Sequence, residues 1–188
     1  MGLTLAYNVV EAGVAVWAGT EAGSIALLGF GLDSVIELAA SAVLLWRLSI
    51  ELGGGEEERV ERAERRSRRF VGLTFLALSG YVLVESVLTL ISGDHPAASP
   101  VGIVLAAVSL VVMPVFAWAK LRTARRLGSG ALEAEAKETL ACAYLSFALL
   151  VGLALNAAVG WWWADPAAAL AMVPWLLREG VEGVRGEE

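Results

Sequence analysis

Two acidic residues inside an apolar stretch are the residues with the clearest chemical potential. Asp33 and Glu37 are the only ionisable residues between Gly23 and Leu45. Their spacing of four places both carboxylates on one face of a helix. An ionised carboxylate in hydrocarbon costs several kcal/mol unless a cation, a proton or water compensates it. The pair therefore predicts a cation site within a membrane, and the alternative is a pair of packing polar residues that hydrogen-bond in the interior.

The same spacing returns in a second segment. Residues 23–37 read GSIALLGFGLDSVIE and residues 128–142 read GSGALEAEAKETLAC, with a constant offset of 105. Chance similarity between segments rich in Ala and Leu is the alternative explanation. The match makes Glu138 and Cys142 the equivalents of Asp33 and Glu37. If the two segments cross the membrane in opposite directions, we expect the four side chains to meet near the bilayer midplane.

Two such pairs on facing helices suit a tetrahedral divalent cation. Carboxylate oxygen and thiolate sulfur both bind zinc. The thiol of Cys142 favours Zn²⁺ or Cd²⁺ over Mg²⁺ and Ca²⁺, while three carboxylates keep Mn²⁺ and Fe²⁺ open. These ligands must lose protons to bind, so metal and protons compete for the site. The alternatives are an inert buried thiol at Cys142 and, at Glu138, a solvated acid beside Lys137.

Three further polar residues are candidates for the same cavity. Asn8 and Glu11 share a face of the first apolar segment, and Glu11 is equally well explained as an interfacial acid. Glu135 precedes Glu138 by three residues and is a candidate fifth ligand, an access residue, or an acid that stabilises the start of a helix. His95 is the sole histidine and falls in a predicted loop, so no histidine is expected among the ligands.

The elements that must position these residues are apolar helices. Of the 188 residues 57% are hydrophobic, which is typical of an all-α polytopic membrane protein. We expect one transmembrane domain over residues 1–188, without a soluble domain. Asp165 and Pro166 are predicted as the N-cap and first residue of the last helix. The six predicted spans are residues 3–20, 23–48, 70–91, 101–119, 139–163 and 165–184.

The charges predict the orientation of these spans. All 14 Lys and Arg residues flank the loops after spans two and four or follow span six. By the positive-inside rule both termini and the two long loops are cytoplasmic, and Trp161–Trp163 lie at the outer interface. Interleaved glutamates and a net charge of −6 argue against nucleic-acid binding. A single cysteine excludes an intramolecular disulfide framework, and a start without a basic region disfavours a cleaved signal peptide.

With these features the chain resembles the cation diffusion facilitators, most closely a compact bacterial branch related to the vesicular zinc-binding transmembrane proteins. The resemblance rests on GSIALLGFGLDSVIE, on the acid–ligand pair at 138 and 142, and on WWWADPAAAL leading into LLREGVEGV. It implies proton-coupled export of a divalent metal by alternating access from a homodimer in the bacterial inner membrane. The implied ligands are Asp33, Glu37, Glu138 and Cys142.

The chain departs from the usual family pattern in three respects. Neither ligand pair contains histidine, and Cys142 replaces the usual second aspartate. The cytoplasmic domain of many members is not expected here, so a dimer would form through membrane helices.

The leading functional hypothesis is a Zn²⁺/proton antiporter without a prosthetic group. The alternative is a membrane metal-binding or metal-sensing subunit that moves nothing. An enzyme is disfavoured, because no nucleophile has an evident base.

Overall fold

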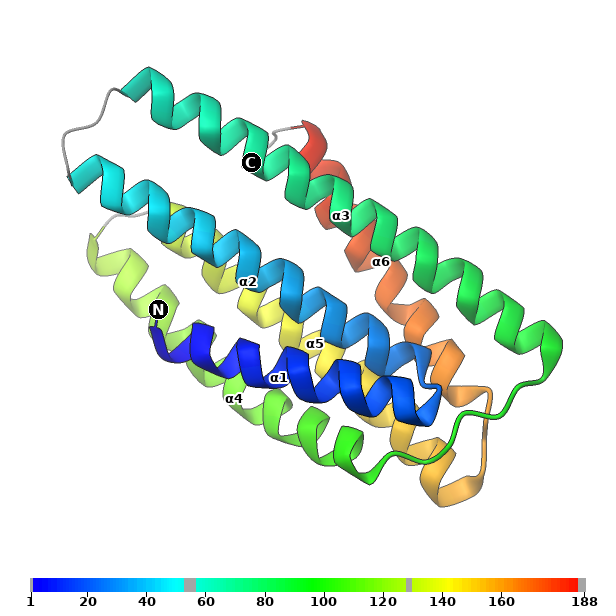
Figure 1. Ribbon diagram of the computed structural model, residues 1–188. Coiled ribbons are helices and arrows are strands. Elements are labelled where there is room, and N and C mark those ends of the chain that lie inside the picture. Colours follow the sequence, from blue (N-terminus) through cyan, green and yellow to red (C-terminus); the bar gives the residue numbers. More distant parts are fainter. Residues whose placement is uncertain (1, 53–56, 128–129, 186–188) are drawn as a thin grey trace.

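The computed structural model describes residues 2–52, 57–127 and 130–185, and this part of the chain contains six helices and no strand. Consecutive helices run antiparallel (Figure 1). The α1–α2, α3–α4 and α5–α6 connections gather at one end of the bundle, here called the turn end. The opposite end holds the first residues of α1, α3 and α5 and the last residues of α2, α4 and α6 (Figure 1). We call it the basic end, because the described Lys and Arg residues lie in the parts of the helices toward it. The helices are α1 (Gly2–Ala22), α2 (Ile25–Leu52), α3 (Glu57–Ser92), α4 (Pro100–Leu127), α5 (Gly130–Val159) and α6 (Ala164–Arg185).

The predicted all-α membrane architecture is confirmed. Within the described residues, four helices contain a segment long and apolar enough to cross a membrane: Ile25–Val43, Arg69–Ser92, Pro100–Arg126 and Ala136–Val159. The other two helices, α1 and α6, lie against these four (Figure 1) but are not among the candidate spans. Acidic residues and many small ones lower their hydropathy. That α1 and α6 also cross the bilayer stays a prediction.

The helices are longer than the predicted spans at the basic end. The structure begins α3 at Glu57 rather than 70, ends α4 at Leu127 rather than 119, and begins α5 at Gly130 rather than 139. The added residues are rich in Glu, Arg, Ala and Leu, which are strong helix formers. Hydropathy identifies only the apolar part of a helix, so the predicted spans do not include these polar extensions.

Each connection at the turn end begins with a glycine in the left-handed conformation. Gly23, Gly93 and Gly160 have φ of 64°, 71° and 72°, and each follows the last residue of a helix. The amide of Gly93 donates to the carbonyl of Thr89 at 3.0 Å, and that of Gly160 donates to Asn156 at 3.1 Å. These bonds satisfy carbonyls that a helix end leaves without partners. Gly160 therefore ends α5 at Val159, before residue 163, where the predicted span ends.

Asp165 caps a different helix from the one predicted. It lies within α6, which begins at Ala164, rather than before it. Its buried carboxylate accepts hydrogen bonds from the Ser24 hydroxyl at 2.5 Å and from the Ile25 amide at 2.9 Å. The Ser24 hydroxyl in turn accepts from the Leu27 amide at 3.1 Å. Asp165 thus fixes the start of α2 to α6, about two turns before Asp33.

Helix α2 occupies the centre of the packing. It contacts α1, α3, α5 and α6, while α3 pairs mainly with α6 and α4 with α5. Fully buried side chains from α2, α5 and α6 form one apolar core on the turn-end side of the candidate site. They include Leu27, Phe30, Leu149, Leu153, Met172 and Leu176.

Candidate metal centre

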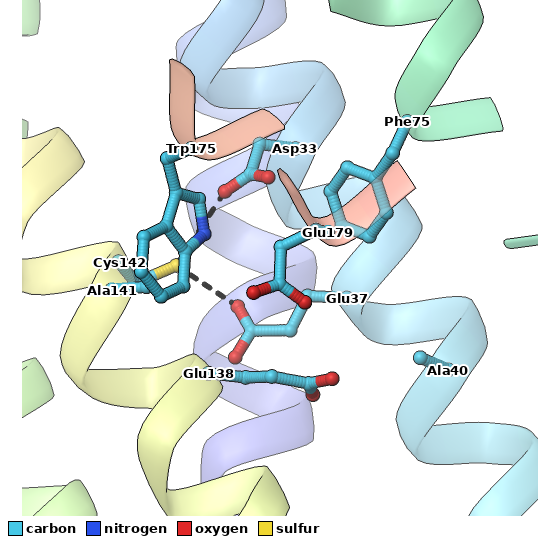
Figure 2. A pocket seen from close by; sticks show the side chains of 9 residues that line it. All are labelled: Asp33, Glu37, Ala40, Phe75, Glu138, Ala141, Cys142, Trp175 and Glu179. Carbon is cyan, nitrogen blue, oxygen red and sulfur yellow. Dashed lines mark hydrogen bonds between the residues drawn. The ribbon is translucent and has the colours of Figure 1, made fainter. Parts of the chain in front are cut away.

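Three of the four predicted ligands lie in direct contact. The Cys142 thiol of α5 lies 3.0 Å from Glu37 Oε2 and 3.7 Å from Asp33 Oδ2 of α2 (Figure 2). All three residues are buried, with exposed fractions of 2% for Cys142, 6% for Glu37 and 5% for Asp33. The one-turn spacing on α2 explains the arrangement, because it presents both carboxylates to the same point on α5.

A small cavity lies beside these three side chains. Its volume is about 20 Å³, which is room for one water-sized particle. Its lining comes from α2, α3, α5 and α6, and it includes both acidic and aromatic side chains (Figure 2). The lining residues are Asp33, Glu37, Ala40, Phe75, Glu138, Ala141, Cys142, Trp175 and Glu179.

Glu138 also lines this cavity, but at a different level along the bundle from Cys142. It lies one helical turn, about 6 Å, nearer the basic end than Cys142. The expected position of Glu138 near the bilayer midplane stays a prediction. Within the described residues, no three His, Cys, Asp or Glu side chains are grouped so that they could hold a metal ion. Simultaneous binding by all four predicted ligands would require their side chains to move.

The donor set suits a borderline-soft cation. Carboxylate oxygen with a thiolate sulfur is a combination that zinc accepts. Among the described residues, the Cys142 thiol is the sole hydrogen-bond partner of Asp33, at the long distance of 3.7 Å. A buried carboxylate with so little compensation favours binding of a cation or a proton.

Glu11 belongs to a separate polar cluster between α1, α2 and α4. Its carboxylate accepts hydrogen bonds from the hydroxyls of Ser34, at 3.1 Å, and Ser109. The hydroxyls of Tyr7 and Ser109 lie 2.8 Å apart. Ser34 faces Glu11 whereas Asp33 faces α5, because consecutive residues are about 100° apart around a helix. The structure therefore places Glu11 outside the cavity, in contrast to the expectation.

Two of the remaining candidates, Asn8 and His95, do not line the cavity. The third is Glu135. Asn8 is buried on α1, and its Oδ1 has no hydrogen-bond partner in the described part of the chain. The side chain of Glu135 is outside the described residues. His95 is exposed at the turn end, as expected, and stacks on Trp162 with ring centroids 5.1 Å apart.

Sequence reasoning missed the contribution of α3 and α6. Phe75 of α3 and both Trp175 and Glu179 of α6 line the cavity. Trp175 and Glu179 have the same spacing of four as the two ligand pairs. That repeated spacing, in a helix expected to cross the membrane, was the feature that could have identified them.

Comparison with known proteins places the chain in a family. Residues 2–185 match the model of the cation efflux transmembrane domain. The chain belongs to this family. It is also 29% identical over 195 residues to an uncharacterised transporter of Synechocystis sp., a match that covers 97% of this chain and 62% of that protein. The chain thus spans less than two thirds of this relative. The family match and the apolar helices indicate an integral membrane protein.

Proposed function

We propose that this protein exports a divalent metal cation, with Zn²⁺ as the preferred cargo, in exchange for protons. The proposal places it in a bacterial cytoplasmic membrane with the basic end, and hence both termini, in the cytoplasm. Positive residues concentrated at one end of a bundle favour that orientation. A homodimer formed through membrane helices is part of the proposal, as the family resemblance implies.

The observation that carries the proposal is the environment of Asp33. This carboxylate is buried in an apolar bundle, and its single described partner is the Cys142 thiol across the α2–α5 contact. A cavity of about 20 Å³ lies beside the pair. A divalent cation in this cavity would compensate the acids and would meet oxygen and sulfur donors together.

Proton exchange follows from the same donors. Cys142 binds a metal only as the thiolate, and the carboxylates bind it only when ionised. Each metal that arrives therefore displaces protons, and each proton that returns weakens metal binding. Coupled to a change of access between the two ends, this competition drives metal export with the inward proton gradient.

The test is zinc flux in proteoliposomes that contain a zinc-sensitive dye. With an imposed pH gradient, we expect zinc uptake by the wild-type protein and loss of uptake by Asp33→Asn, which keeps the side-chain shape. Asp94→Asn is the matched control, because Asp94 is exposed at the turn end. Equal flux from wild type and Asp33→Asn contradicts the proposal. Stoichiometric zinc binding without flux by the wild type would instead support a metal-binding subunit.

A further inference from the structure

We propose that Glu179 of α6 contacts the transported cation and captures it, with Glu138, at the basic end of the cavity. This inference rests on the proposed function and adds a residue to the same site. None of the ligands inferred from the sequence comes from α6. The ion would pass from the two glutamates to Glu37 and Cys142, and then to Asp33.

The first support is the position of Glu179. It lines the cavity together with both ligand pairs, and Figure 2 shows its carboxylate directed toward that of Glu37. Trp175, one turn earlier on α6, lines the cavity as well. Three helices thus each contribute two residues spaced four apart. Because α6 runs toward the basic end, Glu179 lies on the basic side of Trp175.

The second support is that no other described residue forms a hydrogen bond or an ion pair with the Glu179 carboxylate. Glu179 is half-buried and has no hydrogen bond or ion pair within the described residues. The neighbouring cation, Arg178, makes its hydrogen bond to another acid, because its Nε donates to Glu182 Oε1 at 2.7 Å. Its guanidinium carbon lies 5.7 Å from the ring centroid of Trp175. A partly desolvated carboxylate without a bonded partner is a suitable site for an incoming cation.

The third support is the packing that holds Glu179 in place. The next residue, Gly180, lies so close to α3 that a Cβ there would be 2.7 Å from the side chain of Leu76. A Cβ at Gly72 of α3 would likewise be 2.7 Å from the backbone nitrogen of Val184. The backbone around Glu179 is therefore fixed against α3. Its carboxylate belongs to a packed helix rather than to a loose C-terminal segment.

The chemistry gives Glu179 a role different from that of Cys142. Glu138 and Glu179 offer oxygen alone and are only half-buried, so they suit a cation that still carries water. Such a pair attracts Zn²⁺ and Mn²⁺ with little discrimination, whereas the thiol prefers the softer ion. We therefore expect Glu179 to set the apparent affinity for all divalent cargo rather than the choice among them.

The experiment compares Glu179→Gln with Glu182→Gln in the full-length protein. Glu182 is the matched control, because it lies on the same helix, pairs with Arg178 and does not line the cavity. For Glu179→Gln, we expect the KM of Zn²⁺ and of Mn²⁺ uptake into proteoliposomes to rise about tenfold each. The expected change of kcat is less than about twofold, and Glu182→Gln is expected to match the wild type.

A second variant guards against misfolding. Glu179→Asp keeps the carboxylate on a shorter arm, and we expect its KM to lie between those of the wild type and Glu179→Gln. If Glu179→Gln behaves as Glu182→Gln while Asp33→Asn abolishes flux, the role of Glu179 is refuted and the proposed function stands. If the wild type shows no metal flux, both are refuted.

Discussion

Removal of the Asp165 carboxylate tests the link between α6 and the start of α2. The carboxylate accepts from the Ser24 hydroxyl at 2.5 Å and from the Ile25 amide at 2.9 Å, while the Ala26 amide lies at 3.5 Å. Asp165→Ala leaves these donors facing a buried gap, because Asp165 has an exposed fraction of 0%. Asp165→Asn keeps one acceptor oxygen at nearly the same place. The stability of the three forms is therefore expected to fall from wild type through Asn to Ala.

The magnitude follows from the two short bonds. A hydrogen bond to a charged group contributes about 1.5–3 kcal/mol, so two such bonds set an upper range of about 3–6 kcal/mol. The desolvation cost of the carboxylate offsets part of this. The loss of an N-cap side chain alone costs about 0.5–2 kcal/mol. We expect a loss of about 3 kcal/mol for Asp165→Ala and about half of that for Asp165→Asn.

The assay is reversible unfolding in mixed micelles, followed by circular dichroism. Glu21→Ala is the control, because Glu21 is an exposed acid at the same end of the bundle. A double-mutant cycle with Ser24→Ala isolates the shared bond and should be strongly non-additive. If Asp165→Ala costs no more than Glu21→Ala, the cap is not an energetic link between the two helices. The positioning of α2 must then come from apolar packing.

Two further predictions concern the candidate metal centre. Cys142→Ser replaces sulfur by a harder oxygen donor, so the affinity for Zn²⁺ and Cd²⁺ should fall at least about tenfold more than that for Mn²⁺; equal losses in calorimetric titrations would show that the thiol is not a ligand. Zinc binding should weaken as the pH falls from about 7 to 5, because the donors bind metal only after losing protons. A zinc affinity that is constant over this range in the same titrations would exclude competition between metal and protons.

The fold and part of the site could be predicted because the bilayer constrains both. Long apolar segments divided by Gly and by charged loops allow few arrangements other than a helical bundle. The described part of the chain forms such a bundle. The repeated spacing at Asp33 and Glu37 and at Glu138 and Cys142 predicted that these residues surround one space, and all four line the same cavity. Acids in an apolar context are expensive. The acids at these positions therefore indicated a functional site from the sequence alone.

What the sequence could not give was register and rotation. Two antiparallel helices can slide by a turn without changing their hydropathy, and in the structure Cys142 faces Glu37 and Asp33 while Glu138 lies one turn nearer the basic end. The sequence does not determine which face of α1 packs against which neighbouring helix. Only the hydrogen bond with Ser34 shows the direction in which Glu11 points. Asp165 followed the local rule for a helix start, but tertiary contact with Ser24 decided its role.

Three buried carboxylates of this bundle show why the site at Asp33 differs from structural polar groups. Asp165 accepts from a hydroxyl and a backbone amide, and Glu11 accepts from two serine hydroxyls. Each of these acids is compensated by fixed donors, so each can remain buried without a ligand. Asp33 has the distant Cys142 thiol as its sole described partner, beside a cavity. An acid that the protein itself leaves undercompensated favours a cation or a proton as partner. The transported cation that we propose, in alternation with protons, is a partner of this kind.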